Sequence, residues 1–241
     1  MAALINLWWR ELKSLLRLGL FEPRCRGCDN PLVLPEEDVI CRQCLAKIGM
    51  MTGANCKRCS KLLADGLDLC GDCMLKPPPF ERNVSYTVYD GLCKDVILLY
   101  KYAEVQTLKY LLADLLVRLF RHKVNEDFDY IIPVPRDPGR RREFDHLLSL
   151  AKIVSRRLGI PLMKRNLIKI KKTPPQATLP LGQRLRNLNG AFALKQPHLI
   201  QDKRILLLDD VYTTGTTARK CTLLLKKHKA KVTVLTLARS V

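Results

Sequence analysis

Two adjacent carboxylates and a threonine-rich loop form the stretch of the sequence that is best suited to chemistry. Asp209 and Asp210 follow the apolar run 204–208, and they are followed by a loop that contains Thr213, Thr214, Gly215, Thr216 and Thr217. Backbone N–H groups, hydroxyls and the dipole of a following helix favour a phosphate at such a loop. Carboxylates repel a phosphate but suit sugar hydroxyls or a Mg2+ ion. The stretch therefore predicts a sugar-phosphate site, with the acids facing the sugar.

A parallel α/β sheet is the arrangement that would position this stretch. Strand-like and helical patterns alternate along the second part of the chain, which is typical of an open, largely parallel sheet. The expected strands are 83–91, 130–135, 204–208 and 231–238, and the expected helices are 93–123 in two parts, 142–160 and 216–229. Ligands bind such sheets beyond the carboxyl ends of the strands, which is where Asp209 and Asp210 stand.

Eight of the ten cysteines form four CxxC pairs in the first part of the chain. The pairs are Cys25 and Cys28, Cys41 and Cys44, Cys56 and Cys59, and Cys70 and Cys73. Two CxxC turns supply the tetrahedral thiolate shell of a structural zinc ion. The spacing therefore predicts two zinc ribbons, paired sequentially rather than crossed because ribbons close locally, and all-cysteine shells leave no open position for catalysis. Cys93 and Cys221 are expected in the core.

The chain carries a large excess of positive charge, which is concentrated in its second part. Its 241 residues include 42 Lys and Arg against 23 Asp and Glu, a formal net charge of +19. Residues 1–75 hold 10 basic and 9 acidic residues, a net +1, and residues 76–241 hold 32 and 14, a net +18. Such a field favours phosphates, nucleic acid or anionic lipid, although a solvated basic surface gives the same composition.

The first twenty residues have the pattern of an amphipathic helix that contains Trp8 and Trp9. Such a helix either lies on an anionic membrane surface or packs on the protein or a partner, and we favour packing. Because no apolar stretch reaches the roughly 18 residues of a membrane span and no signal peptide is evident, we expect a cytoplasmic protein, with peripheral contact at the inner face of the membrane as the alternative. The expected domains are an amphipathic helix (1–20), a double zinc ribbon (21–76) and an α/β domain (77–241).

Several stretches resemble known families. ILLLDDVYTTGTT (205–217) resembles the phosphoribosyl-pyrophosphate signature of type I phosphoribosyltransferases. The ribbons, together with LLYKYAE (98–104), DYIIPVPRDPGRRREFDHLLSLA (129–151) and TPPQATLPLGQRLRNLNGAF (173–192), resemble the ComF competence family. The resemblance covers residues 20–241 and implies a type I phosphoribosyltransferase-like open parallel sheet after an N-terminal double zinc ribbon.

The resemblance also implies 5-phosphoribosyl 1-pyrophosphate and Mg2+ as ligands. Asp209 and Asp210 would act on the ribose hydroxyls or the metal. Residues 213–217 would hold the 5-phosphate, and Lys101 and Arg136 would meet the pyrophosphate.

One stretch departs from the family pattern, which usually reads Arg-Gly-Phe-Asn-Gln at residues 142–146. Glu143 stands in place of the glycine, and Asp145 and His146 stand in place of the two amides. Negative charge here disfavours pyrophosphate, so turnover as a phosphoribosyltransferase is left open.

The family's role in natural transformation implies incoming single-stranded DNA as the partner, with a competence helicase and DNA-processing proteins as further partners. Phosphate backbones bind basic clusters, and the expected nucleic-acid-binding residues are Arg140, Arg141, Arg142, Lys169, Lys171, Lys172, Arg184 and Arg186. The alternative is a nucleotide-salvage phosphoribosyltransferase that transfers ribose 5-phosphate to a nucleobase and whose basic surface is incidental.

Overall fold

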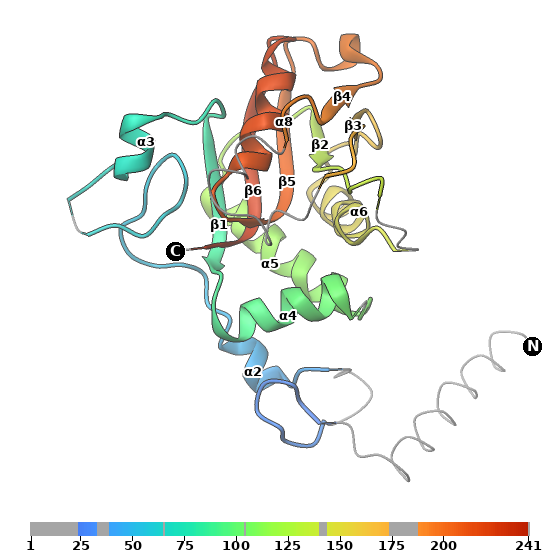
Figure 1. Ribbon diagram of the computed structural model, residues 1–241. Helices are drawn as coiled ribbons and strands as arrows, with labels where there is room; N and C mark the ends of the chain where they lie inside the picture. Colours follow the sequence, from blue (N-terminus) through green and yellow to red (C-terminus); the bar gives the residue numbers. More distant parts are fainter. Residues whose placement is uncertain are drawn as a thin grey trace, which may run out of the picture. The chain divides into compact units, whose positions relative to one another are not determined.

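A parallel β-sheet forms the centre of the computed structural model, which describes residues 24–32, 39–64, 66–103, 105–139, 144–173 and 188–240 (Figure 1). Within these residues the sheet has four parallel strands in the order β1 (Arg82–Val88), β6 (Lys231–Arg239), β5 (Arg204–Tyr212) and β2 (Tyr130–Pro133). The central strands β5 and β6 are largely apolar and buried, as is typical of parallel strands that are covered on both faces. The predicted open parallel α/β sheet is confirmed.

Helices cover both faces of the sheet. Helix α8 (Thr216–Lys226) packs on the face that carries Ile205 and Leu207. Successive residues of a strand point to opposite faces, so Leu206 and Leu208 point away from α8. On that side α5 (Leu108–Lys123) contacts β1 and β6, and α6 (His146–Leu158) contacts β2 and β5.

Local signals fix the ends of the helices that border the carboxyl edge of the sheet. Helix α4 (Gly91–Tyr102) begins after Asp90, whose carboxylate accepts a hydrogen bond from the Gly91 N–H at 2.7 Å. At the start of α6, the Asp145 carboxylate accepts one from the Leu148 N–H at 3.0 Å, which is the usual role of an N-cap aspartate. Helix α6 ends at Gly159, whose φ of 71° suits glycine.

Two features of the sheet region differ from the sequence expectation. Strand β5 does not end at Leu208 but continues through both aspartates to Tyr212, which pairs with Arg239 of β6. An antiparallel ribbon, made of β3 (Leu167–Lys169) and β4 (Phe192–Leu194), is not predicted by the sequence. Strands of three residues are too short to establish a hydrophobic alternation.

The chain divides into two compact units, Met1–Gly49 and Met50–Val241. This division falls inside the region 21–76 that the sequence assigns to the double ribbon. The first four cysteines of the CxxC pairs lie in the smaller unit with helix α2 (Arg42–Ala46). The last four lie in the larger unit with helix α3 (Gly71–Leu75), and they share a core cluster with the α8-facing side of the sheet. The predicted helix over 1–20 lies outside the described residues.

Candidate functional site

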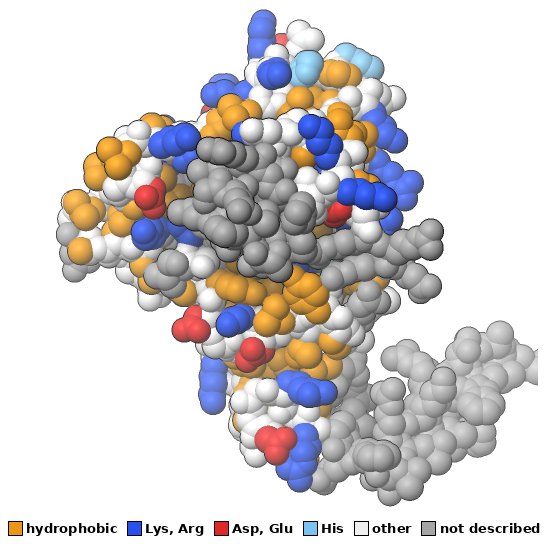
Figure 2. Space-filling view, viewed as in Figure 1, with side chains coloured by type: hydrophobic (Ala, Val, Ile, Leu, Met, Phe, Trp, Pro, Cys, Tyr) orange, Lys and Arg blue, Asp and Glu red, His pale blue; other side chains and the backbone are white. Residues whose placement is uncertain are grey.

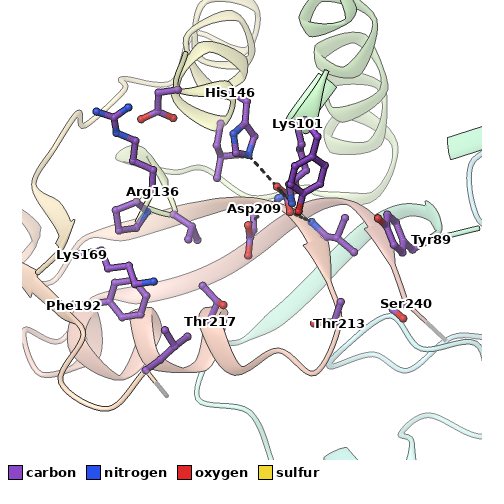
Figure 3. A pocket seen from close by; sticks show the side chains of 18 residues that line it. Tyr89, Lys101, Arg136, His146, Lys169, Phe192, Asp209, Thr213, Thr217 and Ser240 are labelled. Carbon is purple, nitrogen blue, oxygen red and sulfur yellow. Dashed lines mark hydrogen bonds and ion pairs between the residues drawn. The ribbon is translucent and has the colours of Figure 1, made fainter. Parts of the chain in front are cut away.

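A cavity of about 470 Å³ opens at the carboxyl ends of β5 and β2. Side chains from separate elements line it, and they include Lys101 of α4, His146 of α6, Lys169 of β3, Asp209 of β5 and Thr217 of α8 (Figure 3). These elements are far apart in the sequence, and they meet because parallel strands present their carboxyl ends at one edge.

Asp210 belongs to a buried ion-pair cluster in the wall of this cavity. Its Oδ2 lies 2.7 Å from Lys101 Nζ and 3.1 Å from His146 Nε2. Burial alone would raise the pKa of Asp210, but Lys101 and His146 outweigh burial and hold this pKa well below its usual range. Asp210 is therefore a carboxylate that already has basic partners, and a pyrophosphate would have to compete with it for Lys101.

Asp209 is the carboxylate that points into the cavity (Figure 3). Within the part of the chain that the structure describes, no basic side chain forms an ion pair with it, and its Oδ1 accepts a hydrogen bond from the Asp210 N–H at 2.9 Å. Burial and the neighbouring charge of Asp210 raise the pKa of Asp209 to about 8. A half-buried acid of this kind favours a cation such as Mg2+ or the hydroxyl donors of a sugar.

The threonine-rich loop lies beside Asp209 and turns at Gly215, whose φ of 71° is left-handed. It lines a small cavity between the end of β5 and the start of α8. The Thr214 and Thr216 hydroxyls lie 2.8 Å apart and share a hydrogen bond. The first N–H groups of α8 have no partners within the helix, and amides and hydroxyls arranged in this way favour an anion.

Both cysteine groups have the geometry of zinc sites. The four Sγ atoms of each group lie within 4.8 Å of one another. The Cys28–Cys41 and Cys59–Cys70 Sγ pairs lie 3.7 and 3.6 Å apart, close to the roughly 3.8 Å edge of a tetrahedron with Zn–S bonds of about 2.3 Å. The groups are Cys25, Cys28, Cys41 and Cys44, and Cys56, Cys59, Cys70 and Cys73. The sequential pairing is therefore confirmed, and shells of four thiolates suit structural zinc.

The other predicted site residues are found in different surroundings. Arg136 lines the cavity next to the end of β2. Lys169, which the sequence assigns to nucleic acid, also lines the cavity and pairs with Asp137 at 2.6 Å. Lys171 and Lys172 are exposed. Five predicted nucleic-acid-binding residues lie outside the described residues: Arg140, Arg141, Arg142, Arg184 and Arg186.

His146 is a site residue that sequence reasoning does not identify as a contributor. The sequence presents it, with Asp145, as a departure that weakens an anion site. In the structure Asp145 caps α6 and the His146 ring binds Asp210. The available signal was the capping position of Asp145 before an amphipathic helix, which places the next side chain at the carboxyl edge of the sheet.

Within the described residues, no helix combines the length and the apolar character that a membrane crossing requires.

Comparisons with known proteins agree with this architecture. Residues 16–74 match the family described as Double zinc ribbon domain, and residues 148–240 match the Phosphoribosyl transferase domain. The chain is 30% identical over 223 residues to the DNA utilization protein YhgH of Salmonella typhimurium, which covers 90% of this chain and 96% of that protein. This chain is a member of the ComF family. Competence protein F of Haemophilus influenzae is 28% identical over 218 residues, 87% of this chain and 93% of that protein.

Two further proteins extend the comparison. The Bacillus subtilis competence protein ComFC is 25% identical over 244 residues, covering 92% of this ComF-family chain and 97% of that protein. Among solved structures, adenine phosphoribosyltransferase from Saccharomyces cerevisiae aligns with a TM-score of 0.38 and 16% identity, over 58% of this chain and 72% of that one.

Proposed function

We propose that this protein binds 5-phosphoribosyl 1-pyrophosphate with Mg2+ in the cavity at the end of β5, and that it handles incoming single-stranded DNA during natural transformation. The observation that carries the first part is the placement of Asp209, which points into the cavity beside the loop 213–217. A ribose 5-phosphate that spans these two features meets a carboxylate at its hydroxyls and an anion site at its phosphate. Bound Mg2+ would neutralise pyrophosphate oxygens next to Asp209.

Calorimetric titration of the full chain with 5-phosphoribosyl 1-pyrophosphate and Mg2+ tests the pocket. Asp209→Asn should weaken binding at least about tenfold, because it removes the carboxylate that faces the ligand. Asp129→Asn is the matched control, since Asp129 binds Lys203 and the Arg204 N–H at the opposite end of β5. The proposal would be wrong if titration of the wild-type protein gave no heat of binding. It would also be wrong if the Asp209→Asn variant bound the ligand as tightly as the wild type. Release of pyrophosphate on addition of a nucleobase would instead support the salvage reaction.

Affinity for the ligand with Mg2+ should increase with pH and level off above about 8. The pKa of Asp209 is raised to about 8, so below that pH a cation must displace a proton from this carboxyl. Affinity should therefore fall by up to about tenfold for each pH unit below the pKa. Ribose 5-phosphate without Mg2+ provides the reference, because it reports the titration of the phosphate alone. Parallel pH profiles for the two ligands would mean that Asp209 holds no cation.

A basic groove supports the nucleic-acid part of the proposal. It lies at the far end of the β3–β4 ribbon from the cavity, and it is lined by Lys164, Arg165, Asn166, Lys195 and Gln196 among others. The buried Asn166 fixes its shape, since its side chain exchanges two hydrogen bonds with the Gln196 backbone at 3.0 and 2.8 Å. In Figure 2, Lys and Arg side chains gather in the upper right of the view, where Figure 1 labels β3 and β4. Such a rigid, cationic groove suits a phosphate backbone.

Neutralising the three exposed cations of this groove should weaken oligonucleotide binding and flatten its salt dependence. For single strands, each phosphate that the protein neutralises contributes about 0.7 to the slope of log affinity against log salt, so the slope of the triple variant should be smaller by about 2. Fluorescence anisotropy with a labelled single strand at several salt concentrations measures both quantities. The variant is Lys164→Gln, Arg165→Gln and Lys195→Gln, and the control is Arg118→Gln, Arg121→Gln and Lys123→Gln, on exposed positions of α5. Equal losses in both variants would indicate a diffuse charge effect and no groove site.

A further inference from the structure

Arg239 is a buried arginine that joins the second zinc site, made of Cys56, Cys59, Cys70 and Cys73, to the threonine-rich loop. This loop, residues 213–217, is called the phosphate loop. Arg239 is only 9% exposed. Its Nε donates a hydrogen bond to the Cys59 carbonyl at 3.1 Å, and its Nη1 donates to the Thr213 and Tyr212 carbonyls at 2.9 and 3.3 Å. The guanidinium also lies over the Tyr212 ring, 4.9 Å from its centroid. One side chain therefore holds backbone atoms of a zinc ligand and of the loop that turns at Gly215.

Arg239 has no carboxylate partner in the part of the chain that the structure describes, although a buried arginine normally has one. Among the described residues no Asp or Glu forms an ion pair with it, and a buried charge without an opposite charge is strongly disfavoured. The anionic group to which the hydrogen bonds of Arg239 connect it is the second cysteine group, to which Cys59 belongs. Four thiolates around one Zn2+ carry a net charge of −2. With zinc bound, this centre would offset the charge of Arg239.

The hydrogen bonds of Arg239 also determine which groups the loop presents to a ligand. Because the Tyr212 and Thr213 carbonyls accept from the guanidinium, they are turned toward the protein interior. The amides and hydroxyls of the next residues then line the small cavity at the start of α8. Loss of the arginine would free the Thr213 carbonyl, whereas the Tyr212 carbonyl would still accept from the Ser240 N–H at 2.9 Å. A Thr213 carbonyl turned toward the cavity would repel a phosphate.

We propose that Arg239 is a positioning residue through which zinc at the second site holds the phosphate loop in its binding conformation, so that losing this zinc weakens binding of the ligand's phosphate while losing the first zinc does not. This inference rests on the proposed phosphate site at residues 213–217. Coupling between two sites is reciprocal. A bound sugar phosphate therefore slows the release of zinc from the second site.

The test uses the full chain in a Cys25→Ser, Cys28→Ser background, which leaves only the second zinc site intact. Zinc release is followed with a coloured chelator, and binding is measured with ribose 5-phosphate, which probes the phosphate loop alone. Arg239→Gln should release zinc at least about tenfold faster and bind ribose 5-phosphate at least about tenfold more weakly. Arg219→Gln is the matched control, because the Arg219 side chain donates to the Lys76 and Pro77 carbonyls next to the same zinc site. Its bond to the loop is made by the backbone N–H, at the Gly215 carbonyl, and the substitution leaves that group in place.

A second variant separates the charge of Arg239 from its geometry. Arg239→Lys keeps the positive charge but not the planar fork that reaches several carbonyls at once. It should retain zinc as the wild type does and still bind ribose 5-phosphate more weakly. If Arg239→Gln does not fold, the affinity of Arg239→Lys for ribose 5-phosphate still tests the proposal.

The two proposals fail in different ways. If the wild type binds neither ribose 5-phosphate nor 5-phosphoribosyl 1-pyrophosphate, the proposed function is wrong, and zinc release alone still decides whether the zinc centre balances Arg239. If the wild type binds and Arg239→Gln matches it in affinity and zinc release, the inference is overturned while the proposed function stands. Equal effects of Arg239→Gln and Arg219→Gln would also overturn it, since they would indicate a general loss of positive charge near the zinc.

Discussion

Replacing Gly215 with alanine should abolish phosphate binding and lower the free energy of unfolding of the larger unit by about 2–4 kcal/mol. Two effects combine at this position. Gly215 has a left-handed φ of 71°, and a Cβ placed there would lie 2.0 Å from Tyr212 Oη and 2.3 Å from Tyr212 Cζ. The ring cannot move aside easily, because Tyr212 is buried, packs edge-on against Phe80 and lies under Arg239. The loop itself must therefore shift.

Gly159→Ala separates the two effects. Gly159 has the same φ of 71°, but a Cβ placed there would meet no atom within 4 Å. Alanine at this position therefore carries only the left-handed backbone strain of about 1–2 kcal/mol. Urea unfolding measures the stability of both variants, and calorimetry with ribose 5-phosphate measures binding. If the two variants lose equal stability and both still bind, the contact between Tyr212 and Gly215 does not set the shape of the loop.

Lys101→Met should destabilise the larger unit by about 3–5 kcal/mol, because it leaves the carboxylate of Asp210 buried with one basic neighbour fewer. The Asp210 side chain is 12% exposed and the Lys101 side chain 21%. Urea unfolding near neutral pH measures the loss. The exposed pair Lys203–Asp129 provides the control, since Lys203→Met should destabilise the protein far less than Lys101→Met does.

A second substitution and the pH dependence test the cause of this loss. Lys101→Met with Asp210→Asn removes both charges and should recover much of the lost stability. The folded pKa of Asp210 is depressed, so its ion pair stabilises the protein above the unfolded pKa and this contribution is lost as the pH falls. In Lys101→Met that pKa rises, so acidification neutralises the buried carboxylate, and the stability gap from the wild type should narrow. A gap that is constant with pH would mean that Lys101 acts through packing alone.

The strands and helices around the site were largely predictable because their signals are local. The run 204–208 is apolar enough to be a buried strand, and Gly159 marks the end of α6 as a stop residue does. The start of this helix was not predicted, since it begins at His146 after the Asp145 cap and not at the start of the expected range 142–160. The spacing of the CxxC pairs likewise predicts both zinc groups, since the two thiols of each turn are close in the sequence.

The roles of individual charged residues were not predictable, because their partners come from distant segments. Nothing near Asp210 in the sequence indicates that Lys101 and His146 neutralise it and leave Asp209 to face the cavity. The same holds for Lys169, whose charge suggests a surface role until the fold brings it to Asp137. Composition cannot tell a lysine in a cavity wall from one on the surface, because that difference depends on tertiary contacts.

The position of β6 has a consequence for how the protein is made. This strand lies between β1 and β5, although it follows both in the chain, and the hydrogen bond between the Ser85 and Thr236 hydroxyls joins residues 151 positions apart. During translation the edges of β1 and β5 therefore stay unpaired until residues 231–239 have been synthesised. Unpaired apolar edges associate with other chains, and pairing over such a separation is slow. Substitutions that weaken β6 should therefore reduce the yield of soluble nascent protein before they affect the finished molecule.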